Sequence, residues 1–132
     1  MGVNGYLLDT HTFLWALSDP SKLGKEGRTA IENNDYPICV SAASAWEIST
    51  KFRIGKLPGA STVLDDFDHH VDRLGAVELR IGSNHALLSG SLDWGHRDPF
   101  DRMLAAQALT ESLTLITRDG KFHELPQLQT LW

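Results

Sequence analysis

The stretch that decides the fold is residues 96–119, which read HRDPFDRMLAAQALTESLTLITRD. Pro99 suits the first position of a helix because its missing N–H would have no intrahelical partner there. A residue before proline favours extended backbone, so Asp98 is predicted to be the N-cap of this helix. The apolar run 113–117 then predicts a buried parallel strand that ends at Asp119.

The rest of the chain alternates the same two patterns. Short apolar runs predict buried strands, and apolar residues at helical spacing predict amphipathic helices between them. This alternation is typical of a parallel sheet covered by helices. We therefore expect residues 1–132 to form a single α/β domain, a three-layer α/β/α arrangement around a mainly parallel sheet of about four to five short strands. The expected strands are 6–8, 38–40, 76–79, 113–117 and 128–132, and the expected helices are 10–17, 21–33, 42–54, 61–74, 84–92 and 99–109.

The composition argues against several classes of protein. Seventeen acidic and twelve basic residues leave a formal net charge of −5, which argues against binding nucleic acid through overall positive charge. The single cysteine, Cys39, lies in an apolar run and is expected to be a buried small hydrophobe. No apolar run approaches the ~20 residues of a membrane span, and Met1–Gly5 lacks the basic and apolar parts of a secretion signal. We therefore expect a soluble, cytoplasmic protein without a membrane partner.

Four acidic residues are expected to share one edge of the sheet. Asp9 and Asp119 each follow a strand, Glu47 lies on the helix that leaves another strand, and Asp101 begins the helix that leads into the strand before Asp119. The carboxyl ends of parallel strands form the functional edge of such sheets. Clustered carboxylates repel one another, so they must take up protons, bind cations or be held apart. A set of oxygen ligands without a Cys or His cluster favours Mg²⁺ or Mn²⁺, as one or two ions, and predicts metal-assisted hydrolysis of phosphodiester bonds.

Asp98 is a fifth candidate metal ligand. Helix capping explains this residue by itself, but Asp101 follows it by three residues and shares its helix face. When these five acids are set aside, the twelve that remain balance the twelve basic residues. The protein outside the predicted site is therefore neutral, and its net negative charge does not exclude a phosphate-containing substrate.

Basic and hydroxyl side chains beside the acids are candidates for contacts with substrate phosphates. Lys51 follows Glu47 by one helical turn, and an ion pair with that carboxylate would explain it equally well. Trp94 lies in a polar loop, where it could stack on a base or pack beneath the loop. Trp15 and Trp46 are interpreted as core or partner-facing residues. The candidates for substrate binding are Thr10, Lys51, Arg97, Arg102, Thr117 and Arg118, with capping or sheet packing as the alternative for the two threonines.

Two other functions fit parts of this pattern. A phosphatase that forms an aspartyl phosphate on Asp9 would carry a second acid two residues later, where this chain has His11. A non-catalytic regulatory or scaffolding module could use an acidic pocket to bind the arginines of a partner. The presence of all four acids favours a hydrolytic enzyme over both alternatives.

The motifs together resemble those of PIN-domain ribonucleases, and among them the VapC toxins of type II toxin–antitoxin pairs. The resemblance spans nearly the whole chain and rests on the order and spacing of its motifs. These are Leu7-Leu8-Asp9-Thr10-His11, Ser44-Ala45-Trp46-Glu47-Ile48, His96-Arg97-Asp98-Pro99-Phe100-Asp101-Arg102 with Ala105-Ala106-Gln107-Ala108, and Leu115-Ile116-Thr117-Arg118-Asp119.

The resemblance implies a PIN-like fold and a Mg²⁺-dependent endoribonuclease that acts as a toxin on RNA. The four acids of the family correspond to Asp9, Glu47, Asp101 and Asp119, and Asp98 corresponds to an extra acid of one subgroup. The resemblance also implies a homodimer that is silenced by a small cognate antitoxin protein. This chain departs from the pattern at His11, where many members have Asn.

Overall fold

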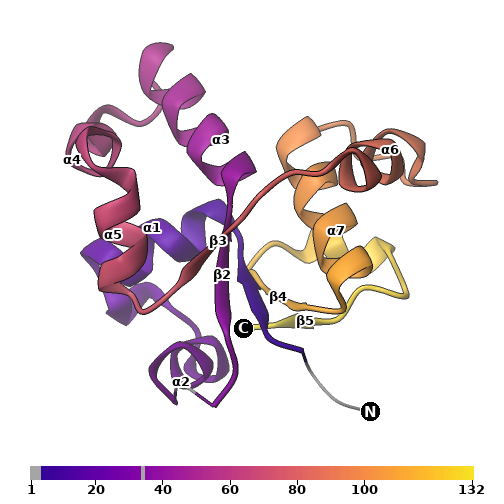
Figure 1. Ribbon diagram of the computed structural model, residues 1–132, viewed down its shortest axis with the longest axis horizontal. Helices are drawn as coiled ribbons and strands as arrows, with labels where there is room; N and C mark the ends of the chain where they lie inside the picture. Colours follow the sequence, from indigo (N-terminus) through magenta and orange to yellow (C-terminus); the bar gives the residue numbers. More distant parts are fainter. Residues whose placement is uncertain (1–3, 34) are drawn as a thin grey trace.

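The structure, a computed structural model, describes residues 4–33 and 35–132. At its centre lies a parallel sheet with the strand order β3-β2-β1-β4-β5 (Figure 1). The predicted α/β class is confirmed, and every expected strand is present. The strands are β1 (Tyr6–Leu8), β2 (Ile38–Ser41), β3 (Val77–Leu79), β4 (Thr114–Ile116) and β5 (Thr130–Leu131).

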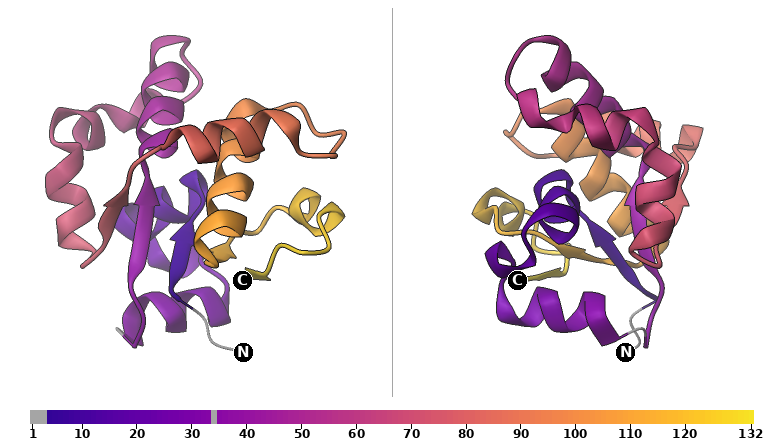
Figure 2. Two further views of the ribbon diagram at one scale, coloured as in Figure 1. Left: turned by 45° about the vertical axis from the view of Figure 1, so that its right-hand side comes forward. Right: turned by 90° about the vertical axis from the view of Figure 1, so that its left-hand side faces the viewer.

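Helices cover both faces of this sheet, as expected for three layers (Figures 1 and 2). The α-helices are α1 (Thr10–Ser18), α2 (Lys25–Asn33), α3 (Ala42–Arg53), α4 (Ser61–Asp65), α5 (Phe67–Arg73), α6 (Ser83–Ser91) and α7 (Pro99–Glu111). Short 3₁₀ helices are η1 (Pro20–Lys22), η2 (Pro58–Ala60) and η3 (Gly120–Glu124). Helices α6 and α7 lie on one side, and α1, α2, α4 and α5 lie on the other (Figure 1).

Successive side chains of the central strands point into two separate cores, because side chains alternate along a strand. Leu7 of β1 packs on one face with Leu104 of α7 and with Cys39, which is buried as predicted. Leu8 packs on the opposite face with Phe13 of α1. A strand that is buried on both faces has a continuous apolar sequence, which is why β1, β2 and β4 are recognisable from sequence.

Capping residues at the helix starts lie at the carboxyl ends of the strands. Asp9 follows β1 and caps α1, and Ser41 ends β2 and caps α3 by accepting from Ala43 N at 2.9 Å. Asp98 caps α7 as predicted: its Oδ1 accepts from Phe100 N at 2.9 Å and from Asp101 N at 3.0 Å. These caps direct α1, α3 and α7 toward one edge of the sheet.

Two predicted helices differ from the structure. The helix expected over 61–74 is broken at Asp66, which has φ −152° and ψ 68° and whose carboxylate accepts from His69 N to start α5. Aspartate favours such caps over helix interiors because its side chain binds the backbone locally. The helix expected over 21–33 is divided into η1 and a later α2.

None of the helices in the described part of the chain is both long and apolar enough to cross a membrane. The absence of a secretion signal was inferred partly from residues 1–3, which lie outside the described residues.

Gln107 of α7 tests how the sheet and this helix are joined. Its side chain is fully buried, accepts from Ser41 Oγ at 2.5 Å and donates from Nε2 to the carbonyl of Arg80 at 3.3 Å. Gln107→Leu removes both hydrogen bonds. We therefore expect a loss of about 1–3 kcal/mol in the free energy of unfolding measured with urea. The matched control, Gln127→Leu at an exposed loop position, should change it by less than ~0.5 kcal/mol. Equal losses in the two variants would contradict the role of Gln107 in joining α7 to the sheet.

Candidate active site

The predicted acids meet at the carboxyl edge of the sheet. A cavity of about 240 Å³ lies there, between the starts of α1 and α7 and residues 47–51 of α3. The four acids expected to be catalytic all line it, and so does the fifth candidate. The lining consists of Asp9, Thr10, His11, Glu47, Lys51, Asp98, Asp101 and Asp119.

Asp9 lies at the floor of this cavity and is 8% exposed. Its Oδ1 accepts from Thr12 N at 2.8 Å, which caps α1, and its Oδ2 accepts from Thr117 Oγ1 at 2.6 Å. Burial raises the pKa of Asp9 above its ordinary value, despite these hydrogen bonds, which act in the opposite direction. Hydrogen bonds therefore hold the Asp9 side chain in place, but they only partly offset the cost of burying its negative charge.

Glu47 lies on α3 and is 4% exposed. Its Oε1 accepts from Thr10 Oγ1 at 2.5 Å, and its Oε2 pairs with the ammonium group of Lys51 one turn later. Burial by itself lowers the pKa of Lys51, but the bond to Glu47 and the nearby carboxylates of Asp98 and Asp101 outweigh it, so this pKa is raised. The side chain of Lys51 lines the cavity itself and therefore lies next to the acids.

Asp101 lies in the first turn of α7 and accepts at Oδ2 from His96 Nε2 at 2.7 Å. Burial, together with the carboxylates of Asp98 and Glu47, raises the pKa of Asp101 to about 6, although His96 acts to lower it. Each neighbouring carboxylate disfavours another negative charge, so a nearby cation would stabilise the ionised form of Asp101.

Asp119 differs from the other acids because it is exposed. It follows Thr117, whose hydroxyl accepts from Asp119 N at 3.0 Å, and its Oδ1 accepts from Lys121 N at 2.9 Å to start η3. Hydrogen bonds with the backbone therefore fix the position of Asp119, which lines the cavity and is exposed to solvent.

The donor chemistry of the cavity fits a hard divalent cation. Its charged oxygens come from carboxylates, which Mg²⁺ and Mn²⁺ prefer. Within residues 4–33 and 35–132, however, no three His, Cys, Asp or Glu side chains converge closely enough to hold one ion. The carboxylates of Asp9, Glu47 and Asp101 are instead engaged by Thr, Lys and His donors. Binding an ion therefore requires some of these carboxylates to exchange their present donors for metal.

The two threonines predicted beside the acids are buried and hydrogen-bonded to them. Thr10 and Thr117 are 3% and 4% exposed, and their hydroxyl groups donate to Glu47 and Asp9. Thr10 Oγ1 also lies 3.0 Å from Ser44 Oγ. These side chains position the acids, and Thr10 also lines the cavity.

Arg102 corrects a sequence prediction. It was expected to contact substrate phosphate, but four of its N–H groups donate to backbone carbonyls, one in the last turn of α6 and three in the segment that connects α6 to α7. The acceptors are Ser89 at 2.9 Å, Leu92 at 2.7 Å, Trp94 at 2.8 Å and His96 at 2.9 Å. The guanidinium group thus holds the loop that carries His96. Arg97 and Arg118 are exposed and remain candidates for phosphate contacts.

The structure also decides the role of one tryptophan and adds residues that the sequence did not identify. Trp94 is buried against Phe122 and donates to Glu124 Oε1 at 2.8 Å, so it packs beneath the loop. His96 was missed as the partner of Asp101, since it belongs to a loop with no regular spacing. Trp15 was interpreted as a core or partner-facing residue, but it lies beside the site; its i, i+4 relation to His11 was the available signal.

The loop that Arg102 holds gives a stability prediction. Arg102→Ala removes four hydrogen bonds from a charged donor, so we expect a loss of about 2–4 kcal/mol in the free energy of unfolding, measured with urea. Arg97→Ala, at an exposed position of the same loop, is the control and should stay within ~0.5 kcal/mol of the parent. If the two variants were equally stable, the role assigned to Arg102 would be wrong.

The crowding of Asp101 gives a pH prediction. An acid with a raised pKa in the folded state makes folding stability decrease as pH rises from its ordinary value of 3.8 to about 6. In metal-free buffer, Asp101→Asn should therefore raise the free energy of unfolding at pH 7, on the order of 2 kcal/mol, with little effect near pH 4. Asp72→Asn, at an exposed position on α5, should show no such pH-dependent gain. A variant that is less stable than the parent at pH 7 would contradict this account.

Comparisons with known proteins agree with this geometry. Ribonuclease VapC22 of Mycobacterium tuberculosis is 28% identical over 131 residues, which cover 96% of this chain and 97% of that protein. The fold is similar to that in a crystal structure of VapBC2 from Rickettsia felis bound to a DNA fragment from their promoter, with a TM-score of 0.72, 18% identity, and coverage of 96% of this chain and 98% of that chain. DNA-bound VapBC from Salmonella typhimurium gives a TM-score of 0.70 at 18% identity, with 96% of each chain covered.

The strongest of these findings is a match to a family as a whole. The family model of the PIN domain matches residues 6–128, which include β1, η3 and all the residues that line the acid cavity. Since this match covers well over half of the sequence, the chain belongs to the PIN domain family.

Proposed function

We propose that this protein is a divalent-metal-dependent endoribonuclease of the VapC type, the toxin of a type II toxin–antitoxin pair. The observation that carries the proposal is one cavity lined by five carboxylates from four separate parts of the chain. Membership of the PIN domain family and the similarity to a protein named ribonuclease VapC22 support the same activity.

The proposed catalytic residues are Asp9, Glu47, Asp101 and Asp119. With Asp98, they are also the proposed ligands of one or two Mg²⁺ or Mn²⁺ ions. When bound, such an ion supplies an activated water and shields the negative charge of the scissile phosphate. The raised pKa of Asp9 and of Asp101 supports this role, because both carboxylates are poorly compensated without a cation.

The other polar residues of the cavity have proposed supporting roles. Thr117 and Thr10 hold Asp9 and Glu47 through their hydroxyl groups, and His96 holds Asp101. Lys51 is next to these acids and is the proposed contact for a substrate phosphate at the cavity.

Arg97 and Arg118 are proposed to bind phosphates farther along an RNA strand, because both are exposed near the edge of the site. Few positive charges are needed for this, since RNA would be held at a local site rather than by the overall charge of the protein.

The proposed partners follow from the resemblance to VapC toxins. A small cognate antitoxin that silences the enzyme, a homodimeric assembly and a cytoplasmic location are parts of the same proposal. The fold neighbours from Rickettsia felis and Salmonella typhimurium are described as VapBC complexes, which supports the antitoxin.

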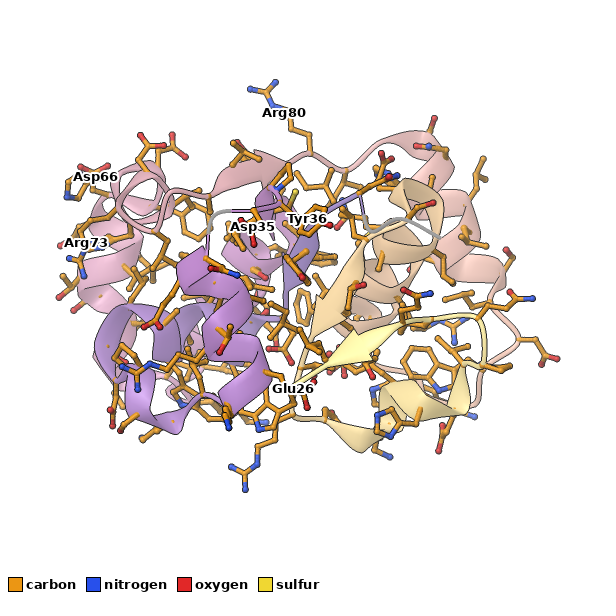
Figure 3. The ribbon with its side chains drawn as sticks, turned by 90° about the horizontal axis from the view of Figure 1, so that it is seen from below. Glu26, Asp35, Tyr36, Asp66, Arg73 and Arg80 are labelled. Atoms are coloured by element: carbon orange, nitrogen blue, oxygen red, sulfur yellow. The ribbon has the colours of Figure 1, made fainter. Side chains whose placement is uncertain are left out.

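The activity is tested with purified protein, labelled single-stranded RNA and Mg²⁺ or Mn²⁺, analysed on sequencing gels. We expect cleavage that EDTA abolishes and that Asp9→Asn, Glu47→Gln and Asp101→Asn each reduce by about 100-fold or more, since even groups one shell away from a metal change activity by 10–100-fold. The control is Asp35→Asn, an exposed acid at the opposite edge of the sheet (Figure 3).

Full cleavage by the acid variants would refute the assignment. Intact RNA with unimpaired binding of Mn²⁺ would favour the non-catalytic acidic pocket instead.

A further inference from the structure

A second cavity, of about 430 Å³, adjoins the acid cavity. It is lined by Asp9, His11, Trp15, Arg118, Asp119 and Gly120. The residues Asp9, His11 and Asp119 line both cavities, so a molecule bound at the acids reaches directly into the second one. Its volume falls within the roughly 300–1,000 Å³ of pockets that hold small ligands.

One wall of this cavity is aromatic. His11 and Trp15 lie one turn apart on α1, with ring centroids 5.7 Å apart. Trp132 packs on Trp15 from the end of β5, at a centroid distance of 5.9 Å. Gly24 permits this packing, because a Cβ there would lie 2.5 Å from the carbonyl carbon of Trp132. Trp15 is thus held by its neighbours but is still partly exposed toward the cavity.

The lining also carries a positive charge. Arg118 follows β4, is exposed, and forms no ion pair with any residue in the described part of the chain. A guanidinium group that is free of carboxylates can bind a phosphate through two parallel hydrogen bonds. The cavity therefore combines an aromatic face, a phosphate-binding group and direct access to the acids.

We infer that this cavity binds the nucleotide adjacent to the scissile phosphate, with its base stacked on Trp15 and its phosphate paired with Arg118. The inference rests on the proposed function, since the acids mark where the phosphodiester lies. Proteins bind single-stranded nucleic acid by this combination of aromatic stacking and backbone charge. A base in a duplex is already stacked and paired, so the cavity selects single-stranded RNA.

Binding measurements in the Asp101→Asn background test the inference without cleavage. The probes are a fluorescein-labelled single-stranded RNA of about 12 nucleotides with random sequence and an abasic ribose–phosphate oligomer of equal length, followed by fluorescence anisotropy. Adding Trp15→Leu should weaken binding of the RNA by about tenfold and leave binding of the abasic oligomer unchanged. Trp15→Phe should largely restore RNA binding because it keeps an aromatic ring.

The matched control is Tyr36→Leu, which removes an aromatic side chain that is 45% exposed at the edge where β2 begins (Figure 3). It should change neither affinity. Tryptophan fluorescence gives a second measurement that does not require Trp15→Leu to fold: the RNA should quench it more than the abasic oligomer does, and Trp15→Phe should remove that difference.

Unchanged RNA affinity in Trp15→Leu, or equal weakening for both probes, would overturn the inference. Either result leaves the proposed ribonuclease activity standing. Cleavage of RNA by Asp101→Asn at the parental rate would instead refute the proposed role of that acid, and the comparison of the two probes would still decide whether bases stack on Trp15.

Discussion

The structure depends on one electrostatic constraint: several carboxylates share a small, partly buried cavity. Coulomb repulsion between unit charges about 4 Å apart amounts to ~4 kcal/mol at an effective dielectric near 20. The fold offsets this repulsion with donors placed around the acids, namely the hydroxyls of Thr10 and Thr117, the ammonium of Lys51 and the imidazole of His96. The compensation is incomplete, because the pKa of Asp9 and of Asp101 remains raised.

This incomplete compensation connects stability with function. Each acid is fixed in position by hydrogen bonds, yet the group as a whole is more stable with a cation or a proton than without one. The carboxylate arrangement that lowers the folding stability of the metal-free protein therefore favours binding of a divalent ion. The apolar burial in the two cores on either side of β1 offsets this destabilisation.

The sequence predicted most of the fold because its central strands β1, β2 and β4 are buried on both faces and its helices carry local start signals. Pro99 after Asp98, and Ser41 after an apolar run, mark helix starts that need no tertiary information. The break at Asp66 was missed because the apolar spacing continues through it. The phosphate contact predicted for Arg102 was wrong for a different reason: three of its four acceptors are backbone carbonyls of an irregular loop, which carry no sequence signal.

The sequence by itself determined the α/β class, the positions of the strands and the identity of the acids at their ends, because these follow from apolar periodicity and from the alternation of strands with helices. Only the tertiary structure decided what surrounds each acid. It placed His96 on Asp101, turned Arg102 into the support of a loop and exposed Trp15 beside Arg118. Trp15 and Arg118 are distant in the chain, and the contacts of His96 and Arg102 lie in an irregular loop, so their geometry depends on packing that no local pattern encodes.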